Sequence, residues 1–400
     1  MRKSLASMFT ILLIFAHTPS VASELSPNVA NCNLFFDGHL ANESVQFQTS
    51  LGPRIPGSNS SMELRESIKS NLSGWEITES NHNINGMNLT NMFATWNSGM
   101  GNTVMFAAHY DTRYKADQDP NISNRGMPVP GANDGASGVA VLMELSRHIP
   151  QMNLSHEVTL FFTDAEDQGD NHSTYVIGAK AWADNLSEDE AKSIQSFILV
   201  DMVGDEFLDL RKTRPGNSTL WERTEQIIRD LDVICQKGDT SYFDFEKVDG
   251  IYDDHVPALD RGIPAIDIID TRFGENASYL GGYWHTIEDT PDKVSADSLH
   301  KVGLILEYGL RNGSWLEVRQ QSASGSEDSD IDYNVDCSDN MGDILDNCDI
   351  DETTSTDNST INVNLFFFAS YFILVSTILG RKLYADYKGR GEIRAPHRDK

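Results

Sequence analysis

TVMFAAHYDT at residues 103–112 and GANDGASGVAVLMEL at residues 131–145 together predict a strand, a polar loop and a helix. The first stretch begins as an apolar run, which indicates a buried strand, and it ends in His109 and Asp111. The second carries apolar residues at helical spacing and predicts a helix over residues 137–148. Histidine and aspartate side chains at the ends of such elements are ligands that zinc accepts.

The same alternation of apolar strand and amphipathic helix continues along the chain. Further buried strands are predicted at residues 157–162, 194–200 and 263–269, and helices at 179–183 and 220–231. This order predicts an α/β fold: a single catalytic domain with a mostly parallel central sheet and helices on both faces. Upstream, residues 24–100 predict a helical opening segment, with short strands at 75–78 and 91–95.

Acidic or histidine side chains accompany all four of the later strands. They are His109 with Asp111, Glu166 with Asp167, Asp201, and Asp267. In open parallel sheets, sites lie beyond the carboxyl ends of the strands, so these side chains are expected to converge on one rim.

Five residues are candidate zinc ligands: His109, Asp134, Asp167, Asp201 and His285. Glu166 and Asp167 are adjacent in the turn after a strand, where one can bind a metal while the other reaches a substrate proton. Asp134 lies just before a helix, where an aspartate is commonly the N-cap. We expect Ser137 to cap that helix, which leaves Asp134 free as a ligand.

These motifs, taken together, resemble the zinc aminopeptidase and glutaminyl cyclase superfamily over about residues 40–310. LGPRIPGS at 51–58, DDHVP at 253–257, RGIP at 261–264 and Trp284 before His285 are typical of glutaminyl-peptide cyclotransferases. The resemblance implies a zinc enzyme acting on peptide N-termini, which cyclises N-terminal glutamine to pyroglutamate and releases ammonia. A zinc aminopeptidase is the alternative, and a non-catalytic receptor-like ectodomain is a third interpretation.

The resemblance also implies a role for each candidate residue. For a cyclase, the implied ligands of a single zinc are Asp134, Asp167 and His285. The implied catalytic residues are Glu166, Asp201 and Asp253. The implied pocket residues are Trp284 and Asp267. Asp167 stands where glutamate is frequent in the superfamily. Asp267 stands where animal cyclases carry a histidine, which resembles the bacterial enzymes.

An aminopeptidase on the same template would bind two zinc ions. The resemblance then implies that His109 and Asp201 hold the second zinc, with Asp134 bridging the two. A hydrolase needs an ionised water, which is easier to form between two metals than beside one. His109 is therefore the residue on which the choice between hydrolysis and cyclisation depends.

The two ends of the chain predict a signal peptide and a membrane anchor. Residues 1–23 have the layout of a signal peptide, which leaves 24–320 as the catalytic domain. Residues 361–380 predict a transmembrane helix, for which a buried core helix is the alternative. The basic residues of 381–400 predict a cytoplasmic tail, and hence a single-pass cell-membrane protein with an extracellular catalytic domain.

Much of the net charge of −29 belongs to one acidic segment. Residues 321–360 contain few large apolar side chains and predict a stalk. The remainder is moderately acidic, which argues against nucleic acid as a partner. Residues 336–349 resemble the calcium repeats of thrombospondin type 3 units, which implies calcium in the stalk; a plain charged linker is the alternative.

Four cysteines in a chain with an export signal allow disulfides. Cys337 and Cys348, which lie close together in the acidic segment, are the predicted pair. Whether Cys32 bonds to Cys235 is left open by the sequence.

Overall fold

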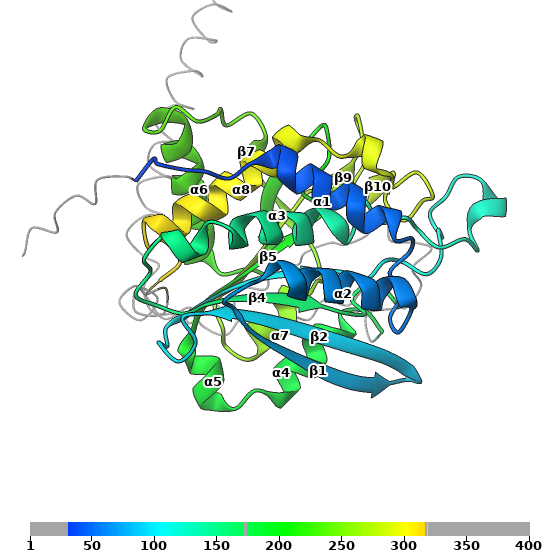
Figure 1. Cartoon of the computed structure of the whole chain (residues 1–400). Helices are drawn as coiled ribbons and strands as arrows, with labels where there is room; N and C mark the ends of the chain where they lie inside the picture. The colour runs from blue at the N-terminus through cyan, green and yellow to red at the C-terminus, as the bar shows by residue number, and fades with distance from the viewer. Residues whose placement is uncertain (1–30, 171–173, 317, 319–400) are drawn as a thin grey trace, which may run out of the picture. The chain divides into compact units, whose positions relative to one another are not determined.

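A six-stranded sheet runs through the centre of the computed structural model, which describes residues 31–170, 174–316 and 318 (Figure 1). The order is β1-β2-β4-β3-β5-β8, and β4, β3, β5 and β8 are parallel. The strands are β1 Glu76–Ile84, β2 Met87–Trp96, β3 Thr103–His109, β4 Val158–Thr163, β5 Ile194–Asp201 and β8 Ala265–Ile269. The predicted α/β class with a mostly parallel sheet is confirmed.

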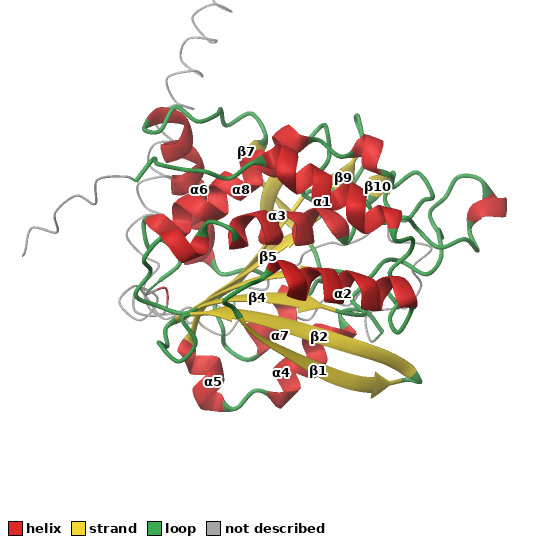
Figure 2. Ribbon diagram, in the orientation of Figure 1, coloured by secondary structure: helices red, strands yellow, loops and turns green. Residues whose placement is uncertain are grey.

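Helices cover both faces of this sheet (Figure 2). One face carries α1 Gly38–Ser50, α2 Asn59–Asn71, α3 Ala136–Ser146, α6 Ser218–Val233 and α8 Ala296–Arg311. The other carries α4 Ile177–Asn185, α5 Glu188–Ser193 and α7 His255–Asp260. Each helix turns its apolar side to the sheet, so the core has two layers.

The position of β3 in the middle of the sheet explains why its sequence is a continuous apolar run. Val104 and Phe106 pack into the core beneath α3 and α8, whereas Met105 and Ala107 pack into the core beneath α4 and α7. Successive residues of a strand point to opposite faces. Since both faces are covered, both sets must be apolar, as in most parallel sheets.

The edge hairpin of β1 and β2 is longer than predicted. The short strands expected at 75–78 and 91–95 extend to Glu76–Ile84 and Met87–Trp96, paired antiparallel throughout. Most of β1 is polar and partly exposed, so it lacks the apolar signal that a buried strand carries.

Several elements of the second half were not predicted. These are α5, α7, α8, the parallel pair β6 Leu210–Arg214 and β7 Phe243–Gly250, and the short pair β9 Arg272–Phe273 and β10 Gly281–Gly282. Single 3₁₀ turns lie at η1 Ile122–Asn124, η2 Ile149–Gln151 and η3 Pro291–Lys293. Most of these elements are short, and short elements leave little periodicity to detect.

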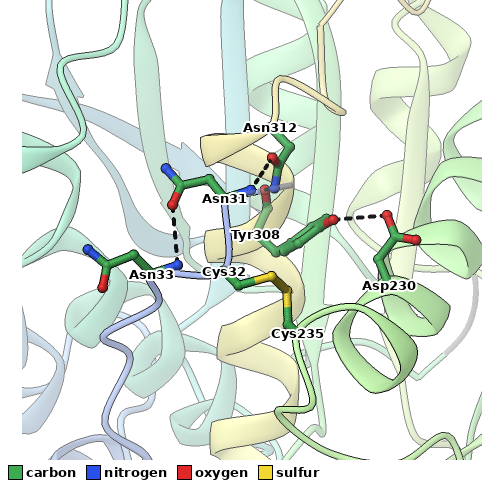
Figure 3. Close-up of a disulfide and its surroundings, with 7 residues drawn as sticks. All are labelled: Asn31, Cys32, Asn33, Asp230, Cys235, Tyr308 and Asn312. Atoms are coloured by element: carbon green, nitrogen blue, oxygen red, sulfur yellow. Dashed lines mark hydrogen bonds between the residues drawn. A yellow bond between two sulfur atoms is a disulfide. The ribbon is translucent and has the colours of Figure 1, made fainter. Parts of the chain in front are cut away.

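A disulfide joins Cys32 to Cys235, just beyond α6 (Figure 3). The two Cα atoms are 5.2 Å apart, although the residues are separated by 203 positions. Next to it, the Tyr308 hydroxyl donates to Asp230 of α6 at 2.9 Å. Closing so long a loop is worth about 5 kcal/mol in the chain-entropy treatment, so this bond ties the start of the domain firmly to its body. Cys337 and Cys348 lie outside the described residues.

The predicted cell-membrane localisation is corrected. In the part of the chain that the structure describes, no helix is long and apolar enough to cross a membrane. The longest described helices, α6 and α8, have 16 residues each, whereas a span needs about 20 apolar residues. The predicted signal peptide, stalk with its calcium site, transmembrane segment and cytoplasmic tail all fall outside the described residues.

Candidate metal centre

The carboxyl ends of three adjacent parallel strands carry the candidate site. His109 is the last residue of β3 and Asp201 the last residue of β5, while Glu166 and Asp167 lie in the turn just after β4. The site is completed by Asp134 from the loop before α3 and His285 from the turn before η3. The rim expected from the sequence therefore forms, and it brings all five candidate ligands together.

The first cluster consists of Asp134, Asp167 and His285, each less than 5% exposed. His285 Nε2 lies 3.2 Å from Asp167 Oδ1 and 3.6 Å from Asp134 Oδ2. Two donors at about 2.0–2.1 Å from a tetrahedral zinc are about 3.3–3.4 Å apart, so these separations suit zinc. Asp167 Oδ1, which faces His285 Nε2, also lies 3.4 Å from Arg113 Nη1, whereas the buried Oδ2 has no hydrogen-bond partner among the described residues and is open to a metal.

The second cluster consists of His109, Asp134 and Asp201. His109 Nε2 lies 3.0 Å from Asp201 Oδ1 and 3.2 Å from Asp134 Oδ1. Asp134 is common to both clusters and directs one oxygen at each histidine. The donors of a two-metal site bridged by Asp134 are therefore all present.

Asp111 holds the turn that carries Glu166 and Asp167. Its buried carboxylate accepts hydrogen bonds from the backbone N–H of Glu166 at 3.0 Å and of Asp167 at 3.2 Å. It also accepts one from the Gln168 side chain at 2.8 Å. The sequence motif contained Asp111, but this structural role was not predicted.

Asp289 does the same for the loop that carries Asp134. Its two oxygens accept from the backbone N–H of Asn133 at 2.7 Å and of Asp134 at 3.2 Å. Sequence reasoning missed this residue. Its position four residues after His285 is a signal that could have drawn attention to it.

The expected cap of α3 is wrong. The helix begins after Gly135, whose φ of +98° suits glycine, and no side chain caps it. The Ser137 hydroxyl donates to the Asn133 carbonyl at 2.5 Å and accepts from Val203 N at 3.1 Å. Asp134 is still free to bind a metal, because the chain turns into the helix after it.

Burial dominates the electrostatics of the acids. It raises the pKa of Glu166 well above the ordinary value, and the charges of Asp253 and Asp167 raise it further. Burial likewise raises the pKa of Asp201, Asp253 and Asp267, the last two also through neighbouring carboxylates. Burial and mutual repulsion thus favour the protonated forms of these carboxyl groups when no metal is bound.

Trp284 stacks on the candidate ligand His285, with ring centroids 3.6 Å apart and 21° between the planes. It also packs against a small apolar cluster that contains Ile269 and Phe273. His285 itself has a φ of +54°, in the left-handed region that residues other than glycine rarely adopt. Such strain persists only where surrounding contacts hold it, and it is common at functional sites.

The fold and the paired carboxylate–histidine clusters define a metal-dependent α/β enzyme. Residues 91–309 match peptidase family M28, so the chain belongs to this family. A glutaminyl-peptide cyclotransferase of Bothrops jararaca is 26% identical over 349 residues, which cover 74% of this chain and 87% of that one.

Two solved structures from Bacteroides thetaiotaomicron represent both activities. A glutaminyl cyclase is similar with a TM-score of 0.64 and 26% identity, covering 70% of this chain and 99% of that one. A leucine aminopeptidase precursor is similar with a TM-score of 0.64 and 27% identity, covering 71% and 99%. The predicted superfamily and the prediction of an enzyme are confirmed, and the family supports a catalytic role on peptide N-termini.

Proposed function

We propose that the protein is a glutaminyl-peptide cyclotransferase that uses one zinc ion, held by Asp134, Asp167 and His285. The ligand separations, the open oxygen of Asp167 and the similarity to glutaminyl cyclases all support this assignment. We assign the catalytic domain to residues 24–320, within which the described elements run from Gly38 to Arg311.

The observation that carries the proposal is the buried cluster of Asp134, Asp167 and His285, together with the similarity to glutaminyl cyclases. Burial also raises the pKa of the neighbouring Glu166. Groups with raised pKa values can hold and exchange protons near neutral pH, as cyclisation requires.

Cyclisation joins two groups of one residue. Bound zinc would supply a Lewis acid that polarises the γ-carbonyl of the N-terminal glutamine. Glu166 accepts a proton from the α-amine as that nitrogen bonds to the γ-carbon, and returns it to the amide nitrogen, which leaves as ammonia. We assign Trp284, which stacks on His285, to the wall of the substrate pocket, and the buried Asp253 and Asp267 to its proton-holding groups. Substrate binding therefore acts mainly by fixing the glutamine side chain in the rotamer that can cyclise.

A zinc aminopeptidase is the second candidate. The complete cluster of His109, Asp134 and Asp201 favours it, because these residues would hold the second metal. Glu166 would then act as the base that deprotonates a water molecule attacking the first peptide bond.

Two peptides that differ only in the first residue separate the candidates. The zinc-loaded protein is incubated with a Gln-initiated and a Leu-initiated peptide, and ammonia and free amino acids are measured. We expect ammonia from the first peptide and no free leucine from the second. Release of leucine without ammonia would overturn the cyclase assignment in favour of the aminopeptidase.

Glu166→Gln tests the proton shuttle in the same assay. Glutamine has nearly the same shape but cannot accept the proton, so we expect kcat to fall by about 10²–10⁴-fold with little change in KM. Glu206→Gln, outside the two ligand clusters, is the matched control and keeps wild-type rates. Unchanged turnover in Glu166→Gln would show that another group carries the proton.

A further inference from the structure

Arg113 and Asp117 form an ion pair behind the first ligand cluster, with Arg113 Nη2 2.6 Å from Asp117 Oδ2. We propose that this pair positions two zinc ligands: Asp117 acts on His285 through its Nδ1, and Arg113 acts on Asp167 through Oδ1 and the backbone carbonyl. The inference rests on the proposed zinc site, but it does not depend on which reaction the site performs.

Asp117 contacts the ring of His285. Its Oδ1 lies 3.3 Å from His285 Nδ1, while His285 Nε2 is the atom that faces Asp134 and Asp167. The contact is at ion-pair distance without hydrogen-bond geometry, and the negative charge beside Nδ1 favours the proton on that nitrogen, which leaves the lone pair of Nε2 for the metal. Asp117 thus favours the tautomer in which Nε2 can bind the metal.

Arg113 connects the ion pair to Asp167. Its guanidinium, fully buried, lies 3.4 Å from Asp167 Oδ1 and donates to the Asp167 carbonyl at 3.2 Å and to the Gly169 carbonyl. The rings of Tyr114 and Tyr175 lie 5.5 and 5.2 Å from it. The fork of Arg113 joins Asp117 to the turn after β4, which a single ammonium group cannot do.

The backbone next to Asp117 holds the strained turn at His285. Gln118 N donates to the His285 carbonyl at 3.2 Å, and Asp119 Oδ2 accepts from Ile287 N at 3.2 Å. Residues 117–119 therefore contact His285 at its ring and its carbonyl and also bind the turn that follows. These contacts explain how His285 keeps a φ of +54° without a glycine.

The charge of Arg113 also has a role. Asp134 and Asp167 are two buried carboxylates that repel each other in one cluster. A guanidinium beside Asp167 offsets this repulsion before any metal is bound, so the donors stay together. The pair thus preorganises the ligands as well as orienting them.

Zinc affinity tests the proposal directly. The dissociation constant is measured by competition with a chromophoric chelator for the wild type, Asp117→Asn and Asp117→Ala. We expect a 10- to 100-fold weaker affinity for Asp117→Ala, and a smaller loss for Asp117→Asn, which retains an acceptor for Nδ1–H. Asp292→Asn removes the same charge at an exposed position and should bind zinc like the wild type.

Arg113→Lys keeps the positive charge but loses the fork, and it should also weaken zinc binding. Replacing zinc by cobalt gives an absorption spectrum that reports ligand geometry, and we expect it to change in both Asp117→Ala and Arg113→Lys. Wild-type affinity and spectrum in folded Asp117→Ala would overturn the proposal. Weakened affinity in a protein that cyclises no peptide would support it and reject only the proposed function.

Discussion

At the scale of a single residue, Asp134 belongs to both alternatives for this site, the one-metal and the two-metal arrangement. One of its oxygens faces His109 and the other faces His285, so it is a ligand in a one-metal and in a two-metal site alike. His109 is different. It has a metal role only if a second zinc binds; otherwise its Nε2 bonds to Asp201 at 3.0 Å within the carboxyl network.

His109→Gln distinguishes these roles by metal content. Glutamine can still donate to Asp201 but is a poor zinc ligand, so a one-zinc enzyme should retain about one zinc per chain, as in the wild type. Elemental analysis of the purified proteins measures this number. His156→Gln, at a buried histidine outside both clusters, is the control. A fall from two zinc ions to one would identify a two-metal site.

The sequence predicted the candidate ligands that the structure brings together, but not the residues that contact them. His109, Asp134, Glu166 and Asp167 stand in motifs next to strands and helices that periodicity reveals. Asp117 lies in an irregular loop, and its partner His285 is 168 positions away. Such a contact leaves no local pattern, because only the path of the chain brings the two loops together.

At the scale of elements, the site depends on how closely α3 packs on the sheet. A Cβ at Gly138 would lie 2.1 Å from the Val200 carbonyl oxygen and 3.0 Å from the Ala108 side chain. The helix that follows Asp134 can therefore lie against β3 and β5 only because residue 138 has no side chain. The close approach sets where Asp134 stands relative to His109 and Asp201.

Gly138→Ala should push α3 away from β5. Overpacking against backbone cannot be relieved by a rotamer change, so we expect the free energy of unfolding to fall by about 3 kcal/mol. Chemical denaturation measures this loss. In Gly126→Ala the new Cβ meets nothing within 4 Å, and stability should change by less than about 0.5 kcal/mol. Equal stability of the two variants would contradict the close packing.

At the scale of the whole molecule, a cluster of buried acids opposes folding when no metal is bound. Burial raises the pKa of Asp164, Asp254 and Asp289 to about 7. Burial alone would lower the pKa of His285, but Asp167 and Asp117 raise it to about 9. Each raised pKa adds stability at low pH that is lost as the group gives up its proton.

The stability of the metal-free protein should therefore fall as pH rises from about 4 to about 9. For the three aspartates the loss begins above the unfolded pKa of about 4 and is complete above about 7; for His285 it lies between about 6.5 and 9. Zinc acts in the opposite direction, because its ligands must be deprotonated. The rise in Tm on adding zinc should grow from pH 5.5 to pH 8, as measured by thermal unfolding. A constant rise would contradict a site made of these groups.

The sequence by itself determined the class of fold and named the candidate metal ligands. Strands buried on both faces must be apolar throughout, and motifs such as HYD and GANDGASG stand next to them. The strands and the motifs can therefore both be recognised in the sequence alone. Only the tertiary structure decided which carboxylates share a cluster, which acids hold protons, and that Cys32 bonds to Cys235. These properties depend on distance and burial between residues far apart in the chain, and folding alone sets those quantities.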